Sequence, residues 1–264
     1  MTTAAPFPET LQRIERWKAD PDVLGVVWVG SKSLGYGDER SDDDLEVLLT
    51  DAAHAKLAPE QCLEALIEGE GDARRIVWDA QLVARSEIEA KARSTADLDH
   101  WPYQRAPVLF DRDGGTARAV AAAGAMAPGF RHARLTHATL DAWVAARRGR
   151  KTESRGQRTA VRALMGRACR ALTRIVFALE GRWVPLDHWL DAELASLADA
   201  SGAVPAVRDA WSGNDPAAID RALALLAPAL AREDVPTEIE AIRDLFAQVV
   251  HPSRARERAI HAVI

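Results

Sequence analysis

The chain has 264 residues and a formal net charge of −5, with 48% hydrophobic and 28% charged residues. These proportions are typical of a soluble globular protein, and the length accommodates two domains of ordinary size. Proteins that bind a nucleic-acid duplex usually carry a strong basic excess, because Lys and Arg contact the phosphates. The chain as a whole lacks that excess, which argues against long nucleic acid as its main substrate.

Cysteine content and hydropathy exclude several further classes. Two cysteines, Cys62 and Cys169, are too few for a disulfide framework or for a zinc site, which needs about four clustered ligands. The sequence contains no run of about 18 apolar residues, the length that is needed to span a membrane. Residues 1–9 lack the basic start and apolar centre of a signal peptide. We therefore expect a cytoplasmic protein with no membrane partner.

The first third of the sequence mixes helix and strand patterns. Hydrophobic spacing predicts helices over residues 10–19 and 59–68. Short apolar or alternating runs predict strands over residues 24–29, 44–49, 75–83 and 107–110. A loop rich in glycine and serine, residues 30–41, separates the first two strands.

After Gly115 the strand patterns disappear, and alanine, leucine and arginine dominate. Helices are predicted over residues 135–147, 157–179, 187–198, 216–230 and 237–249. The sequence therefore predicts an α/β (α+β) domain with a mixed sheet over residues 1–118, followed by a helical bundle over residues 119–264. We expect substrates to meet between the two domains.

The most informative stretch joins a buried strand to a strand of acids. The first strand ends in Gly30-Ser31, where a missing side chain lets backbone amides approach a phosphate and a hydroxyl adds a donor. On the following strand, Asp42, Asp44 and Glu46 share one face. Such carboxylates repel one another unless a cation neutralises them. Magnesium prefers oxygen ligands and leaves room for substrate phosphates, so the pattern favours nucleotide chemistry.

Two other groups of residues extend this interpretation. Asp79 lies in the middle of a predicted strand whose opposite face is apolar, a position where aspartate is depleted. It is the candidate third metal ligand and the candidate catalytic base. Arg155 and Arg158, with Arg162, lie along one edge of a helix and are candidates for binding a triphosphate, for which the guanidinium fork is well suited.

Residues 29–49 resemble the signature of the polymerase-beta-like nucleotidyltransferase superfamily: a hydrophobic residue, Gly-Ser, a spacer of about ten residues, then Ser-Asp-x-Asp. Here Gly30-Ser31 and Ser41-Asp42-Asp43-Asp44 supply the motif. Within the superfamily, the chain looks most like the aminoglycoside nucleotidyltransferases and their uncharacterised bacterial relatives. The similarity is looser over residues 75–113 and weaker in the helical part.

The resemblance implies a nucleotidyltransferase catalytic domain that uses Mg²⁺ and transfers a nucleoside monophosphate (NMP) to a hydroxyl of a small-molecule acceptor. The expected nucleotide is AMP, taken from ATP, and an aminoglycoside-like antibiotic is a candidate acceptor. Asp42, Asp44 and Asp79 would bind the metal. Nucleotide contacts would come from Gly30, Ser31 and Lys32, and from Arg155 and Arg158. The expected partners are the NTP and the acceptor, and a homodimer is compatible with the sequence.

The sequence departs from the family pattern at two positions. Asp43 stands where relatives usually carry an apolar residue, which leaves a second register, with Asp44 and Glu46 as ligands, open. Lys32 follows Gly-Ser where several relatives have an arginine. The alternatives for the third carboxylate are Glu46 and Glu87. The alternative functions are nucleotidyl transfer to protein or tRNA, and nucleotide binding without catalysis.

Overall fold

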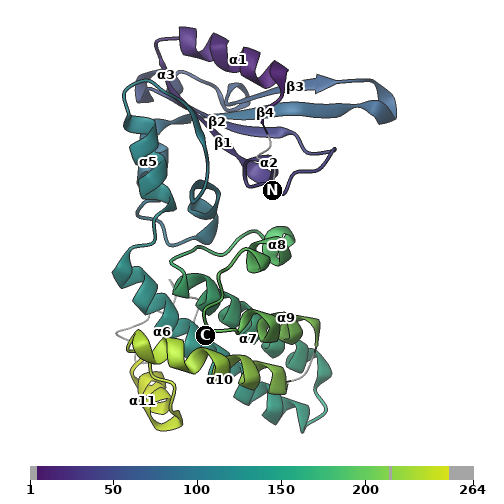
Figure 1. Cartoon of the computed structure of the whole chain (residues 1–264), viewed down its shortest axis with the longest axis vertical. Helices are drawn as coiled ribbons and strands as arrows, with labels where there is room; N and C mark the ends of the chain where they lie inside the picture. Colours follow the sequence, from purple (N-terminus) through teal and green to yellow (C-terminus); the bar gives the residue numbers. More distant parts are fainter. Residues whose placement is uncertain (1–4, 214–215, 250–264) are drawn as a thin grey trace. The chain divides into compact units, whose positions relative to one another are not determined.

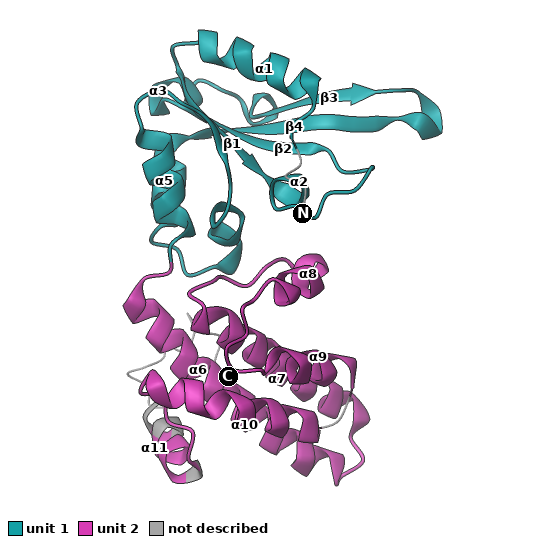
Figure 2. Cartoon of the chain, in the orientation of Figure 1, with its two compact units in different colours: residues 1–125 teal, residues 126–264 magenta. Residues whose placement is uncertain are grey.

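The computed structural model describes residues 5–213 and 216–249, and the chain divides into two compact units, Met1–Ala125 and Met126–Ile264 (Figure 2). The expected boundary between residues 118 and 119 falls inside the last helix of the first unit, Gly115–Gly124. A mixed α and β unit is followed by a helical unit, as the predicted fold class requires.

The first unit contains the following elements in chain order: α1 (Pro8–Ala19), β1 (Val23–Val29), α2 (Gly30–Ser33), β2 (Asp43–Leu49), α3 (Asp51–His54), η1 (Pro59–Gln61), β3 (Leu63–Glu68), η2 (Gly71–Ala73), β4 (Arg75–Ala84), α4 (Arg85–Lys91), η3 (Asp97–Asp99), η4 (Trp101–Tyr103), β5 (Val108–Asp111) and α5 (Gly115–Gly124). The strands form one sheet in the order β3-β4-β2-β1-β5. Only β2 and β4 are parallel neighbours among these strands; the other pairs are antiparallel, so the sheet is mixed.

Both faces of this sheet are covered by helices (Figure 1). Ile14 and Trp17 of α1 pack on one face, which includes Leu45 of β2. On the opposite face, where Leu48 of β2 is buried, Ile88 of α4 packs in one cluster with residues of α5 and η4. Since β2 contributes to two cores, its burial is nearly continuous, and the carboxylates at its beginning emerge from a well-packed strand.

The second unit contains α6 (Pro128–Glu153), α7 (Arg158–Leu179), η5 (Asp187–Trp189), α8 (Leu190–Ala195), α9 (Val204–Ser212), α10 (Pro216–Arg232) and α11 (Ile239–Val249). Its core is a single cluster of buried residues that includes Leu135 of α6, Leu172 and Phe177 of α7, and Leu226 of α10. Within the described ranges, no helix combines the length and the apolar character that crossing a membrane requires.

Some predicted elements need correction. The helix expected over residues 59–68 is wrong: a short 3-10 turn, η1, leads into the strand β3. Leucine, glutamate and alanine favour a helix there, but pairing with β4 along its whole length makes the segment extended. The helix expected over residues 187–198 is limited to η5 and α8. Helices α4, α5 and α9 were not predicted.

Candidate metal centre

Three aspartates, two on neighbouring strands and one directly before the first of them, form a cluster of carboxylates. Asp42 directly precedes β2, Asp44 is its second residue, and Asp79 lies within β4, where it is the register partner of Asp44. One carboxylate oxygen of each lies within 4.8 Å of the other two, and all three residues are half-buried. The parallel pairing of β2 and β4 therefore brings together the three carboxylates that the sequence singles out.

The three carboxylates repel one another when ionised. Burial, together with the charges of Asp42 and Asp79, raises the pKa of Asp44 to about 7. Burial and the charge of Asp42 also raise the pKa of Asp79. A cation bound between the carboxylates would relieve this repulsion, and an all-carboxylate set of oxygen donors is the type that hard divalent cations prefer. The residues present fit such a site.

Gly30 shapes the cluster from the end of β1. Val29 is the register partner of Asp44, so the next residue, Gly30, passes directly beside the Asp44 side chain. A β-carbon at position 30 would lie 1.8 Å from Asp44 Oδ2, and Gly30 has a φ of +77°. Beyond the phosphate access expected from the sequence, this glycine leaves room for the Asp44 carboxylate.

Asp43 and Lys32 form a buried ion pair, a feature that the sequence did not indicate. Lys32 Nζ lies 2.7 Å from Asp43 Oδ1, and the two side chains are 9% and 0% exposed. Asp43 Oδ2 accepts hydrogen bonds from the Thr10 hydroxyl at 2.6 Å and from the Phe7 N–H at 2.7 Å. Lys32 Nζ also lies 3.2 Å from the centre of the Phe7 ring. The ammonium group expected to contact the triphosphate thus already has partners within the protein.

The remaining predicted nucleotide contacts lie in different units. Ser31 is half-buried in α2, next to Gly30, and its carbonyl accepts the backbone N–H of Tyr36 at 2.9 Å. Arg155 and Arg158 belong to the second unit, in the turn between α6 and α7 and at the first residue of α7, and both are exposed. Gly30 and Ser31 thus share a unit with the aspartates, whereas the two arginines do not.

The alternative third carboxylates have other partners. The Tyr103 hydroxyl lies 2.8 Å from both carboxylate oxygens of Glu46, and Lys91 Nζ lies 3.9 Å from one of them. Burial raises the pKa of Glu46. Glu87 accepts the Ala84 N–H at 3.0 Å at the beginning of α4. These contacts give both glutamates structural roles, which favours Asp79 as the third member of the cluster.

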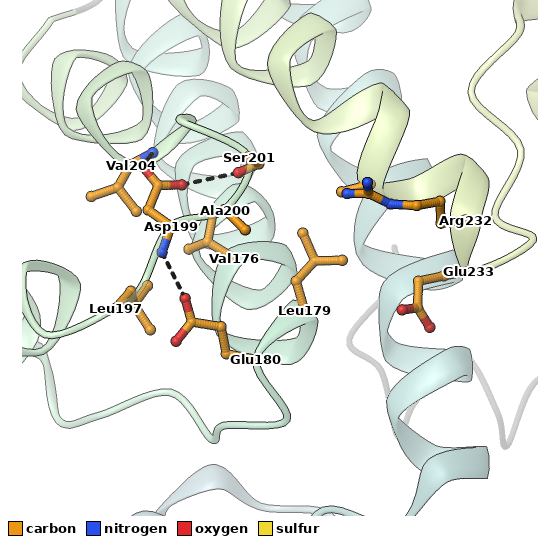
Figure 3. Close-up of a pocket in the computed structure, with 11 residues that line it drawn as sticks. Val176, Leu179, Glu180, Leu197, Asp199, Ala200, Ser201, Val204, Arg232 and Glu233 are labelled. Atoms are coloured by element: carbon orange, nitrogen blue, oxygen red, sulfur yellow. Dashed lines mark hydrogen bonds between the residues drawn. The ribbon is translucent and has the colours of Figure 1, made fainter.

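A separate cavity of about 130 Å³ lies within the second unit (Figure 3). Its acidic side chains and Ser201 are bonded to the chain itself: Glu180 accepts the Asp199 N–H, and the Asp199 carboxylate accepts the Ser201 hydroxyl and the Val204 N–H. Glu233, also in its wall, forms an ion pair with Arg131. These bonds stabilise the loop before α9 and leave the acidic cluster as the stronger candidate site.

Comparisons with known proteins add a structural likeness. No protein-family model matches the sequence, and the search of curated proteins finds no significant match. Among solved structures, the chain is similar to a nucleotidyltransferase-like protein from Exiguobacterium sibiricum 255-15, with a TM-score of 0.45 and 15% identity over 96% of this chain and 87% of that chain. The chemistry of the site therefore has to be inferred from its own residues.

Proposed function

We propose that the protein is a metal-dependent nucleotidyltransferase that transfers AMP from ATP to a hydroxyl of a small-molecule acceptor and releases pyrophosphate. The observation that carries the proposal is the cluster of Asp42, Asp44 and Asp79, whose oxygens lie within 4.8 Å of one another beside Gly30. The motif in residues 29–49 supports the same chemistry, and aminoglycoside-like molecules are the first acceptors to test.

In this proposal Asp42 and Asp44 hold Mg²⁺, and Asp79 completes the set of carboxylates. The bound ion would offset the negative charge of the triphosphate and help to orient it for in-line displacement. Asp44 and Asp79 stand on paired strands within a packed sheet, and Asp42 directly precedes the first of these strands, so the backbone fixes the positions of the ligands before substrate arrives. Such fixed positions are what transfer reactions of this kind require from a protein.

Asp79 would act as the general base. Its carboxylate lies beside the pair that would hold Mg²⁺, within reach of an acceptor brought to the same ion, and burial and Asp42 raise its pKa in the metal-free protein. It takes the proton of the acceptor hydroxyl while that oxygen bonds to the α-phosphorus of the nucleotide. The bond from the α-phosphorus to the bridging oxygen breaks, and pyrophosphate leaves with the electron pair.

Nucleotide contacts follow from the same arrangement. The backbone at Gly30 and the Ser31 side chain lie next to Asp44 and would contact phosphate oxygens. For Arg155 and Arg158, which belong to the second unit, contact with the triphosphate stays an expectation from the sequence alone. Lys32 would do so only by giving up its ion pair with Asp43, so we assign it the weaker role.

The test is pyrophosphate release, measured with Mg²⁺ and each NTP against panels of aminoglycosides, lincosamides, nucleosides and tRNA. The proposal expects release that depends on both ATP and one small acceptor. Asp42→Asn should abolish it, whereas Asp72→Asn, which removes an exposed carboxylate of η2, should leave it unchanged. Magnesium-dependent ATP binding without turnover on any acceptor would instead indicate a nucleotide-binding protein.

A further inference from the structure

Charge is distributed unevenly along the chain. Residues 147–162, Arg-Arg-Gly-Arg-Lys-Thr-Glu-Ser-Arg-Gly-Gln-Arg-Thr-Ala-Val-Arg, contain seven basic residues and one acidic residue, a net charge of +6. Because the whole chain carries −5, the other residues together carry −11. The acidic total, which argues against nucleic acid as the main substrate, therefore does not describe this segment.

The structure gathers these basic residues at one end of a helical hairpin. The segment covers the last turns of α6, the connecting turn and the beginning of α7, two helices that pack closely against each other. All seven basic side chains are exposed. Arg150 forms an ion pair with Asp220. The other six define a surface that we call the basic tip: Arg147, Arg148, Lys151, Arg155, Arg158 and Arg162.

The basic tip is short of anionic partners. Among residues 5–213 and 216–249, no carboxylate oxygen lies within 4.0 Å of a side-chain nitrogen of these six residues, so none of them forms an ion pair there. Arg147 lies over the ring of Trp143, 5.3 Å from its centre. Like charges brought together in this way repel one another, so the surface is one that a polyanion would stabilise.

Two open hollows lie between these side chains. One, of about 470 Å³, is lined by Trp143, Arg147 and Lys151 among others. The second, of about 520 Å³, includes Arg158 and Arg162 in its wall. Both are formed within the second unit. Their combination of shallow shape and cationic walls suits an extended anionic chain better than a compact enclosed ligand.

We propose that the basic tip binds the phosphate backbone of a single nucleic-acid strand. Five of its six residues are arginines, whose planar fork contacts phosphate and stacks on bases. Arg147 and Lys151, like Arg158 and Arg162, are four residues apart on a helix, hence separated by a rise of ~6 Å. That separation lets neighbouring side chains contact different phosphates of one strand.

The surface fits other macromolecules less well. A helix that lies on a membrane presents large apolar side chains beside its basic ones, and protein interfaces usually have an apolar or aromatic centre. The large exposed hydrophobic residues of the described chain, such as Leu63, Ile67 and Trp211, all lie outside residues 147–162. Basic side chains beside the half-buried Trp143, whose ring can stack on a base, favour a nucleic-acid strand.

The experiment measures fluorescence anisotropy of labelled, unstructured 20-nucleotide RNA and DNA strands with the full chain, without NTP, over a series of salt concentrations. The triple variant Arg147→Gln, Lys151→Gln, Arg158→Gln removes three charges from the basic tip. Since each phosphate contact contributes about −0.7 to the slope of log K against log salt, this variant should bind more weakly with a slope shallower by ~2. Binding of either strand in this way supports the proposal.

A matched control removes two arginines and one lysine from exposed positions of the first unit: Arg16→Gln, Lys56→Gln, Arg93→Gln. It should retain wild-type affinity and slope. Equal losses in the two triple variants would overturn the proposal, as would an absence of strand binding or binding to phosphatidylserine vesicles alone. Full displacement of the strand by equimolar ATP would also overturn it, since the surface would then be a nucleotide site. Asp42→Asn should bind RNA normally, which keeps this result independent of the proposed transferase activity.

Discussion

The backbone of Gly30 passes so close to Asp44 that a β-carbon at position 30 would lie 1.8 Å from Asp44 Oδ2. Gly30 also adopts a φ of +77°, which side-chain-bearing residues rarely tolerate. The glycine therefore meets two separate requirements, one of the backbone and one of the neighbouring carboxylate. The requirement of the carboxylate links the Gly-Ser turn to metal binding. Substitutions can separate it from the requirement of the backbone.

Gly30→Ala should weaken Mg²⁺ binding by about 10–100-fold, the loss typical when residues that support a metal ligand are altered. The reason is that the methyl group must displace the Asp44 carboxylate. Calorimetric titration of the folded variant with Mg²⁺ measures the effect. Gly35→Ala is the matched control, because Gly35 has a φ of +79° but no atom within 4 Å of the added carbon.

Gly35→Ala should lose stability to the same backbone strain while keeping wild-type metal affinity. If the two variants bind Mg²⁺ equally well, the contact between Gly30 and Asp44 is not what positions the ligand, and the loop would have to act on phosphate alone.

Asp44 should make the metal-free protein sensitive to pH. Its pKa is raised to about 7 in the fold, above the ordinary value of 3.8 to which it returns on unfolding. Between these values unfolding releases a proton, so the free energy of unfolding falls as pH rises from about 4 to 7 and levels off above. Asp44→Asn removes this contribution, and its stability relative to wild type should increase over the same window.

Urea unfolding of wild type and Asp44→Asn in EDTA, from pH 4 to 8, measures the difference. Added Mg²⁺ should stabilise wild type at pH 8 and leave Asp44→Asn unchanged, because only wild type retains the complete set of carboxylates. A stability difference that stays constant across the series would mean that Asp44 titrates normally. Asp72→Asn controls for removing an exposed carboxylate.

The buried pair of Lys32 and Asp43 should be a determinant of stability. Asp43→Ala leaves the Lys32 ammonium buried without its partner, and removing one member of such a pair costs about 3–5 kcal/mol. Replacing both, as Lys32→Met with Asp43→Leu, should cost less than the sum of the single changes, since no buried charge remains. Urea unfolding measures all three variants. A cost below about 1 kcal/mol for Asp43→Ala would contradict the role assigned to the pair.

Local patterns explain why much of the site could be predicted. The strand alternation that places Asp42 and Asp44 on one face has a period of two residues, and Asp79 stood out as an acid within an apolar strand. The register that sets Asp79 beside Asp44 is a pairing between strands far apart in the chain. Sequence could suggest the residues but not this pairing.

The same distinction explains what was missed. Asp43 lies on the apolar face of β2, and its partners Lys32 and Thr10 come from other elements, so only the fold reveals why an acid is tolerated there. Similarly, β3 has the composition of a helix, with Leu63 67% exposed and Ile67 42% exposed. Its extended form depends on hydrogen bonds to β4, which no pattern within residues 59–68 contains.

The last prediction separates an enzyme from a nucleotide-binding scaffold. Asp79 is the one member of the cluster contributed by β4, and its side chain stands on the same side of the sheet as Asp42 and Asp44. If it is the base, Asp79→Asn should lower kcat by about 10²–10⁴-fold. Affinity for ATP should fall much less, because Asp42, Asp44 and the Gly30 backbone still contact the nucleotide.

Single-turnover kinetics and ATP titration of the same Asp79→Asn preparation measure the two effects, and Glu87→Gln is a matched control from the neighbouring helix. Raising the pH should not restore the lost rate, since an amide cannot accept the proton. Near-wild-type turnover in Asp79→Asn would exclude it as the base, and Glu46 would become the next residue to test. An equal loss of ATP affinity and of kcat would instead assign Asp79 to metal binding alone, because a base acts on the acceptor hydroxyl after the nucleotide has bound.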